Sequence, residues 1–168
     1  MEKLSIVSGN ILEHLKDKDL IVNSANQYMI CGSGVCGAIY KKANKELLED
    51  YCKTHYKEYM KVNEVRITPG FNLGLDILHI YCPKYYESKT PILDLLDSYN
   101  KIFLSAKEKG YKNILSVSLG TGVHGYKHID IAKDIVGGLN VLVKKYDIAF
   151  TLVLPSEEIK KIYSNYLW

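Results

Sequence analysis

The sequence predicts an α/β domain in which a largely parallel sheet is covered by helices on both faces. Short apolar runs of strand length alternate with longer segments whose apolar residues recur at helical spacing. One run, Leu20–Ser24, begins with three consecutive apolar residues, as in an interior strand buried on both faces. Glycine-rich loops follow two of the runs and each leads towards a helix, an arrangement typical of parallel α/β folds.

Four runs in the first half of the chain have the length and composition of strands: residues 4–7, 20–24, 62–68 and 77–82. A short helical turn is expected after the first run, which Gly9 ends. Helical spacing follows the second run from Ala38 onward, and Asn44 marks a possible break into two helices. Pro69 and Gly70 turn the chain after the third run.

The second half is expected to alternate helices and strands regularly. Its first helix has Thr90 as cap, Pro91 at the first position and Gly110 just beyond the end. The remaining elements are predicted as a strand over 114–119, a helix over 129–145, a strand over 148–154 and a last helix from residue 156.

Length and composition predict one globular domain over residues 1–168. The net charge of +3 comes with scattered lysines, so we expect no strong nucleic-acid footprint. Neither a signal peptide nor an apolar run of membrane length is recognisable, and a cytoplasmic location with no membrane partner is expected. The four cysteines form no C-x-x-C pair, which argues for reduced thiols and against a structural zinc site.

The first glycine loop, Gly32–Gly37, spells G-S-G-V-C-G. This formally matches the dinucleotide fingerprint, but the preceding apolar run ends at Val22, well short of the first glycine, and no acidic residue ends the next strand. A strand, glycine loop and helix in succession nevertheless present unpaired N–H groups and a positive helix end. We therefore expect an anion site, most often for phosphate.

A second glycine loop, Gly120–Tyr126, follows the strand expected over residues 114–119. A single loop of this kind is more often a tight turn than a ligand site. Two loops at the carboxyl ends of two strands, however, indicate one pyrophosphate held from both sides.

Together these motifs resemble the macrodomain, a module that binds ADP-ribose, over nearly the whole chain. The resemblance rests on G-N-I near the start, V-N-S-A-N and G-S-G-V-C-G-A-I around the first loop, I-T-P-G-F-N-L in the middle and G-V-H-G-Y in the second loop. It implies a three-layer sandwich with a mixed, mainly parallel sheet of six or seven strands. It also implies that ADP-ribose lies across the strand ends.

By this resemblance Asn10, beside Ile11, faces the adenine amino group, and Asn26 holds a hydroxyl of the distal ribose. Backbone amides of the two loops cradle the phosphates. The substrate-binding residues are thus expected to be Asn10, Ile11, Asn26, Gly32, Ser33, Gly34, Val35, Cys36, Gly120, Thr121, Gly122, Val123 and His124.

Four features depart from the family pattern. The first is Asn10, which stands where the family usually has an aspartate. Cys36 stands where the hydrolase branch has an aspartate, and His124 replaces an aromatic ring. Leu154 and Pro155 occupy the region from which an aromatic side chain often stacks on adenine.

Several of these residues have a structural alternative. We expect the ligand role for Asn26 and a structural role for Asn23. Cys36 is expected either to fill the pocket floor or, with a thiol pKa lowered by the helix end, to act as a nucleophile. His124 is either a base or a planar shield beside the distal ribose, and His79 is expected to be a satisfied interior histidine.

The predicted function is hydrolysis of mono-ADP-ribosyl ester linkages or of O-acetyl-ADP-ribose, with Asn26 and His124 as catalytic residues. A water held by Asn26, the loop amides and the substrate's own phosphate would attack. No metal or cofactor is implied, because neither loop contains a carboxylate or a cysteine–histidine cluster. A reader that binds ADP-ribose or a mono-ADP-ribosylated protein without chemistry, and an ADP-ribose 1″-phosphate phosphatase, remain alternatives.

Overall fold

A computed structural model of the chain describes residues 3–168. Its centre is a six-stranded sheet in the order β1-β6-β5-β2-β4-β3. All neighbouring strands pair in parallel except β3, which runs antiparallel to β4 at one edge. The strands are β1 Leu4–Ser8, β2 Leu20–Ser24, β3 Val65–Thr68, β4 Asp76–Ile80, β5 Asn113–Val117 and β6 Ala149–Leu154.

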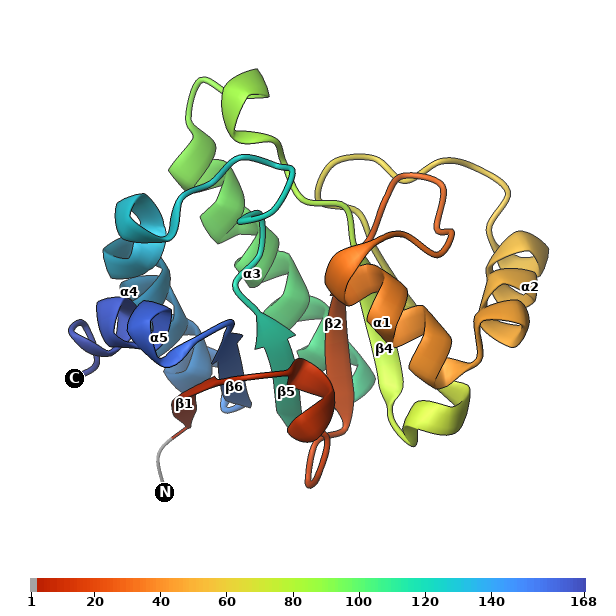
Figure 1. Cartoon of the computed structure of the whole chain (residues 1–168), viewed down its shortest axis with the longest axis horizontal. Helices are drawn as coiled ribbons and strands as arrows, with labels where there is room; N and C mark the ends of the chain where they lie inside the picture. Colours follow the sequence, from red (N-terminus) through yellow and green to blue (C-terminus); the bar gives the residue numbers. More distant parts are fainter. Residues whose placement is uncertain (1–2) are drawn as a thin grey trace.

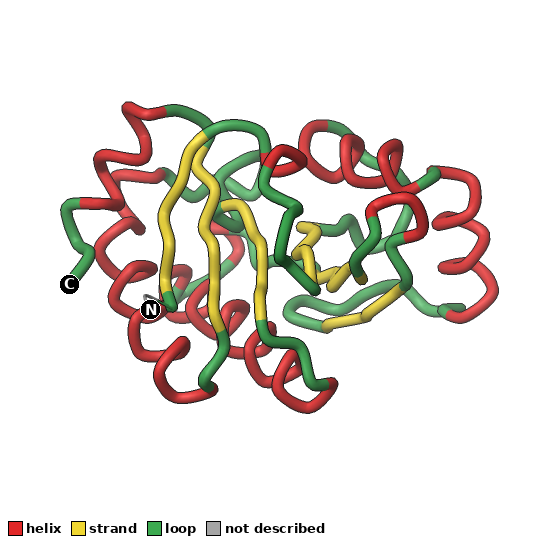
Figure 2. The backbone as a smooth tube through the Cα atoms, turned by 90° about the horizontal axis from the view of Figure 1, so that it is seen from below, coloured by secondary structure: helices red, strands yellow, loops and turns green. Residues whose placement is uncertain are grey.

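Helices lie on both sides of the strands, which makes three layers and confirms the predicted fold class (Figure 2). Figure 1 shows α1 and α2 on the right and α3, α4 and α5 on the left. The helices are α1 Gly34–Ala43, α2 Lys45–His55, α3 Pro91–Lys109, α4 His128–Tyr146 and α5 Glu157–Ser164. Three short 3₁₀ turns complete the structure: η1 Ile11–Glu13, η2 Phe71–Leu73 and η3 Tyr85–Glu87.

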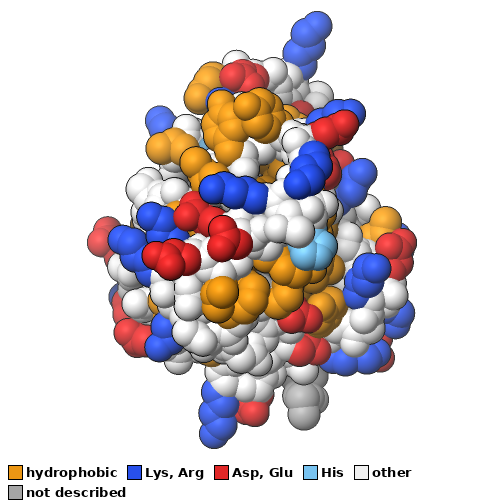
Figure 3. Space-filling model, turned by 90° about the vertical axis from the view of Figure 1, so that its right-hand side faces the viewer, with side chains coloured by type: hydrophobic (Ala, Val, Ile, Leu, Met, Phe, Trp, Pro, Cys, Tyr) orange, Lys and Arg blue, Asp and Glu red, His pale blue; other side chains and the backbone are white. Residues whose placement is uncertain are grey.

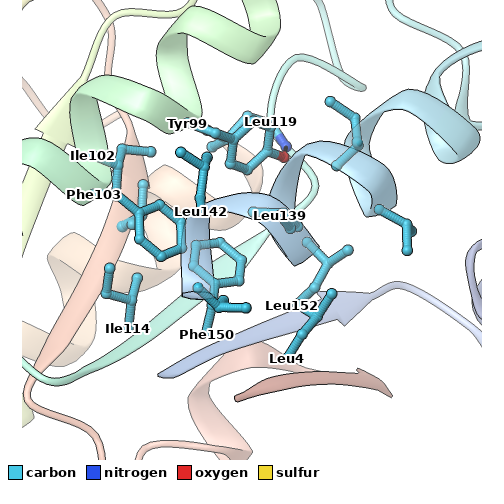
Figure 4. Packing of buried hydrophobic residues seen from close by; sticks show 14 of the residues in the cluster. Leu4, Tyr99, Ile102, Phe103, Ile114, Leu119, Leu139, Leu142, Phe150 and Leu152 are labelled. Atoms are coloured by element: carbon cyan, nitrogen blue, oxygen red, sulfur yellow. Dashed lines mark hydrogen bonds between the residues drawn. The ribbon is translucent and has the colours of Figure 1, made fainter. Parts of the chain in front are cut away.

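Successive residues of β2 enter two different cores, as expected for an interior strand. Leu20 and Val22 belong to the core beneath α3, α4 and α5, whereas Ile21 belongs to the core beneath α1 and α2. In the first core Phe103 stacks on Phe150 with ring centroids 5.4 Å apart (Figure 4). Both faces of the sheet are therefore buried beneath helices.

Two predicted boundaries are wrong by three or more residues, and the others differ by at most two. The first long helix begins at Gly34 rather than Ala38, so part of the first glycine loop is already helical. The third strand begins at Val65 rather than Val62, because Lys61–Glu64 forms a turn in which Glu64 Oε1 accepts from the Lys61 N–H. The predicted break at Asn44 is confirmed, since this residue separates α1 from α2 and caps the latter.

The surface seen from the α2 side carries basic and acidic side chains interspersed with separate hydrophobic patches (Figure 3). That face therefore presents no continuous basic stripe of the kind that tracks a nucleic-acid backbone. Within residues 3–168, no helix combines the length and apolar character needed to cross a membrane.

Candidate functional site

A cleft of about 800 Å³ runs across the carboxyl ends of β1, β6, β5 and β2. The loops after β2 and β5 both lie at the top of the molecule in Figure 1. All thirteen residues expected to bind substrate line this cleft: Asn10, Ile11, Asn26, Gly32, Ser33, Gly34, Val35, Cys36, Gly120, Thr121, Gly122, Val123 and His124. The fold thus brings together segments that lie more than 100 residues apart.

No lysine, arginine, aspartate or glutamate is found among the described residues that line the cleft. An anion bound there must therefore be held by backbone N–H groups, helix ends and neutral side chains. Within residues 3–168, no three histidine, cysteine or acidic side chains gather as a metal site would require.

The first loop delivers the N-terminal end of α1 to the cleft. Ser33 is the cap residue but makes no side-chain capping bond, and the first intrahelical bond runs from the Gly37 N–H to the Ser33 carbonyl at 3.2 Å. The helix N–H groups before Gly37 thus have no intrahelical partner. Gly34, with φ of +58°, adopts a left-handed conformation that favours glycine.

Asn26 lines the cleft but also holds the first loop together. Its Oδ1 accepts from the N–H groups of Tyr28 (3.1 Å) and Ile30 (3.3 Å), while its Nδ2 donates to the Ile30 carbonyl (2.8 Å). The side chain thereby supports the turn in which Met29 has φ of +54°. One of its two Nδ2 hydrogens remains for a ligand.

The second loop is a tight structure built on glycines. Gly120 has φ of +79°, and an added Cβ there would lie 2.6 Å from the ring of Tyr126, whose N–H donates to the Gly120 carbonyl. Thr121 Oγ1 donates to the Ser118 carbonyl at 3.0 Å, which closes the base of the loop. Gly122 has open space around it.

His124 is held in one tautomer by this loop. Its Nδ1 lies 3.2 Å from the Pro83 carbonyl, which only accepts, so Nδ1 carries the proton and Nε2 is left as an acceptor. Its ring packs edge-on against Tyr81, with centroids 5.8 Å apart. The arrangement suits a base or hydrogen-bond acceptor at the cleft wall.

Cys36 behaves differently from the nucleophile considered above. Burial raises the pKa of the Cys36 thiol, and this effect outweighs the lowering by hydrogen bonds from Gly32 and Asn23. The expectation of a lowered thiol pKa is therefore wrong. At neutral pH the group is a neutral thiol, which is neither an activated nucleophile nor a substitute for a carboxylate base.

The two asparagines of V-N-S-A-N have separate environments. Asn23 is fully buried, and its Nδ2 donates to Nδ1 of His79 at 3.1 Å. Nε2 of His79 lies 2.9 Å from Thr68 Oγ1, and burial lowers the His79 pKa to about 3. The prediction of a satisfied interior His79 is confirmed. Asn23 bonds this histidine rather than the backbone of a turn, and its Oδ1 has no hydrogen-bond partner among the described residues.

Asn10 caps η1, since its Oδ1 accepts from the Leu12 N–H at 3.0 Å. This bond uses one of the two lone pairs of the amide oxygen. Ile11, the first residue of η1, is 3% exposed and contributes an apolar floor.

Sequence reasoning missed several residues of the cleft, of which Ser24, Ser118 and His128 carry polar side chains. His128 is the first residue of α4, where the predicted helix began one residue later. Ser118 directly follows β5 and is 5% exposed. The one signal in the sequence for His128 as a cleft residue was its position next to the second loop.

The fold and the site together define a three-layer α/β protein with a cleft at its strand ends, and no Asp, Glu, Lys or Arg is found among the described residues that line this cleft. The Macro domain family model matches residues 22–135. A Fusobacterium nucleatum protein described as uncharacterized is 31% identical over 90% of this chain and 85% of its own. The O-acetyl-ADP-ribose deacetylase of Salmonella newport is 27% identical over 98% of this chain and 94% of its own.

Among solved structures, an Oceanobacillus iheyensis macrodomain mutant with ADPR is similar with a TM-score of 0.86 and 29% identity. The alignment covers 97% of this chain and 90% of that one. The chain belongs to the macrodomain family.

Proposed function

We propose that this chain binds ADP-ribose in the cleft and hydrolyses an ester of it, either O-acetyl-ADP-ribose or a mono-ADP-ribosyl ester. One observation carries the proposal: two glycine loops and an uncapped helix end line a cleft that contains no charged side chain among the described residues. Such a lining suits a pyrophosphate bound by N–H groups together with neutral ribose hydroxyls. The deacetylase name of the Salmonella relative and the ADPR-bound macrodomain support the same ligand.

The two loops have distinct tasks in this mechanism. Amides of Gly34–Cys36 and Gly120–His124 hold the pyrophosphate, and the free Nδ2 hydrogen of Asn26 binds a hydroxyl of the distal ribose. For O-acetyl-ADP-ribose, water adds to the acetyl carbonyl carbon and the bond from that carbon to the ribose oxygen breaks. One proton of the water ends on the ribose oxygen. The other stays on the acetic acid, which leaves and ionises to acetate, releasing that proton to solvent.

Two groups are candidates to accept the proton during this transfer. One is the substrate's own phosphate, and the other is Nε2 of His124, the acceptor left by the bond from Nδ1 to Pro83. A His124→Phe variant separates them, because it keeps a planar ring at the cleft wall and removes the acceptor. Retained turnover would assign the proton to the phosphate, whereas lost turnover with intact binding would assign it to His124.

A reader that binds without chemistry is the second candidate, and Cys36 is the observation that favours it. A neutral thiol occupies the place where the hydrolase branch has a carboxylate, so the cleft offers no acidic base. Hydrolysis with this lining depends on the substrate phosphate or on an imidazole.

The deciding experiment measures binding and turnover on the same preparation. Calorimetry should show ADP-ribose binding more tightly than AMP, which lacks the second phosphate and the distal ribose. The protein is then incubated with O-acetyl-ADP-ribose, ADP-ribose 1″-phosphate and proteins mono-ADP-ribosylated on glutamate, serine or arginine. Binding without release from any of these would leave the reader, and no binding of ADP-ribose would refute both functions.

A further inference from the structure

Three hydrogen-bonded side chains lead from the cleft into the layer formed by α4 and α5. His128 lines the cleft, and its Nδ1 lies 2.7 Å from the hydroxyl of Tyr163. The same hydroxyl lies 2.8 Å from Oγ of Ser118. Tyr163 is fully buried and packs edge-on against the His128 ring, with centroids 5.5 Å apart. The imidazole is thus fixed by partners that solvent barely reaches.

The second ring nitrogen of His128, Nε2, has no hydrogen-bond partner in the described part of the protein. If Tyr163 donates to Nδ1, then Nε2 carries the proton and donates; if the Nδ1 proton is donated to Tyr163, then Nε2 accepts. Burial lowers the pKa of His128, which keeps the ring neutral at pH 7. Nε2 is therefore a single, neutral hydrogen-bonding group at the cleft.

The position of His128 in the fold relates it to a particular part of the nucleotide. It follows Tyr126, the last residue of the second glycine loop, by two residues, and its partner Tyr163 comes from α5, which packs against β1 and β6. Asn10, expected at the adenine, follows β1, while the phosphates are expected at the glycine loops. The ribose of adenosine joins the adenine to the phosphates, so it must pass between these two places.

We propose that His128 binds a hydroxyl of the adenosine ribose, with Tyr163 and Ser118 as the residues that position it. The proposal rests on the proposed binding of ADP-ribose. A hydroxyl both donates and accepts, so it pairs with Nε2 in either tautomer. The adenine amino group only donates and the adenine ring nitrogens only accept, so each matches one tautomer alone. This contact makes the cleft selective for ribonucleotides over deoxyribonucleotides.

The test compares ADP with 2′-deoxy-ADP and 3′-deoxy-ADP by calorimetry on the wild-type chain and on His128→Phe. The wild-type protein should bind one deoxy ligand about five- to tenfold more weakly than ADP, as loss of one hydrogen bond predicts. His128→Phe should bind ADP more weakly by the same factor and no longer distinguish the three ligands. His55, which is exposed on α2 and does not line the cleft, provides the control. The His55→Phe variant should bind all three ligands with the affinities of the wild type.

Tyr163→Phe tests the positioning role, because it keeps the buried ring and removes only the hydroxyl. It should reduce the discrimination between ADP and the deoxy ligand, and circular dichroism should confirm that the variant folds. Should His128→Phe not fold, His128→Ala provides the same comparison. Wild-type protein that binds ADP and both deoxy ligands equally, or a folded His128 variant that still discriminates, would overturn this inference alone. Absence of any binding of ADP-ribose or ADP would refute the proposed function as well.

Discussion

Replacing Gly34 by valine tests whether the first glycine loop holds a phosphate. Gly34 is the first residue of α1, with φ of +58°, and an added Cβ there would meet no heavy atom within 4 Å. The folded protein therefore has room for the side chain, and the direct cost is backbone strain of about 1–3 kcal/mol. That room is the cleft itself, since Gly34 lines it. The valine methyl groups would occupy space through which a phosphate approaches the helix N–H groups.

The size of the effect follows from the bonds that the valine would block. A hydrogen bond from an N–H group to a charged oxygen contributes about 1.5–3 kcal/mol. Micromolar binding of ADP-ribose, the expected range, corresponds to about −8 kcal/mol. Losing two such bonds therefore weakens binding at least about a hundredfold and moves the dissociation constant towards millimolar.

Calorimetry with ADP-ribose measures this loss, and thermal unfolding measures the strain separately. Gly74→Val is the matched control, because Gly74 also has positive φ (+80°) and open space but ends η2, away from the cleft. Both variants should lose similar stability, while only Gly34→Val should lose binding. A folded Gly34→Val protein that binds ADP-ribose normally would mean that the phosphate does not lie on this loop.

Four further outcomes are expected. Asn26→Ala should lower ester hydrolysis by about a hundredfold, or roughly 3 kcal/mol in the transition state. Cys36→Ala should change turnover less than about tenfold, whereas Cys36→Asp should raise it unless the carboxylate repels the phosphate and weakens binding. Asn10→Leu should cost about 1–3 kcal/mol of ADP-ribose binding while Asn10→Asp keeps it; unchanged binding in Asn10→Leu would remove adenine recognition from this residue. Because folding lowers the His79 pKa to about 3, the unfolded chain binds the extra proton below about pH 6.5. His79 alone should therefore make the free energy of unfolding, measured in urea, about 2 kcal/mol lower at pH 5 than at pH 7, and His79→Gln should reduce the pH dependence by that amount.

The sequence predicted the fold and the lining of the cleft because both depend on local patterns. Strand-length apolar runs fix where the strands lie, and parallel strands place their carboxyl ends at one edge of the sheet. The residues that follow β1, β2 and β5 therefore meet, although the chain alone does not give the strand order. The sequence also indicated that the lining carries no fixed charge, since neither loop contains Asp, Glu, Lys or Arg.

The start of α1 could not be predicted, because its first turn contains two glycines and glycine disfavours helix interiors. The structure explains why each of the two positions is a glycine. Gly34 needs positive φ, and an added Cβ at Gly37 would lie 2.4 Å from the Gly32 carbonyl oxygen. These glycines are required by close packing and by a turn, which are tertiary properties.

Long-range contacts account for the other differences. The pKa of Cys36 depends on how deeply the thiol is buried against the first loop, which no spacing reveals. Likewise, His128 acquires its hydrogen-bond partner from Tyr163, 35 residues further along the chain. Their residue types indicated possible chemistry, but only the packing of α1 on the first loop and of α4 against α5 determines it.

Asn26 shows why the loss of activity in its alanine variant needs a second measurement. Its Oδ1 and one Nδ2 hydrogen hold the first loop, so Asn26→Ala removes those bonds together with the proposed contact to the distal ribose. ADP separates the two effects, because it keeps both phosphates and lacks the distal ribose. If the side chain acts through the ribose, Asn26→Ala should bind ADP as the wild type does and ADP-ribose several-fold more weakly. If ADP binding falls equally, the side chain acts through the loop that positions the phosphate amides, and the distal ribose must be held by another group.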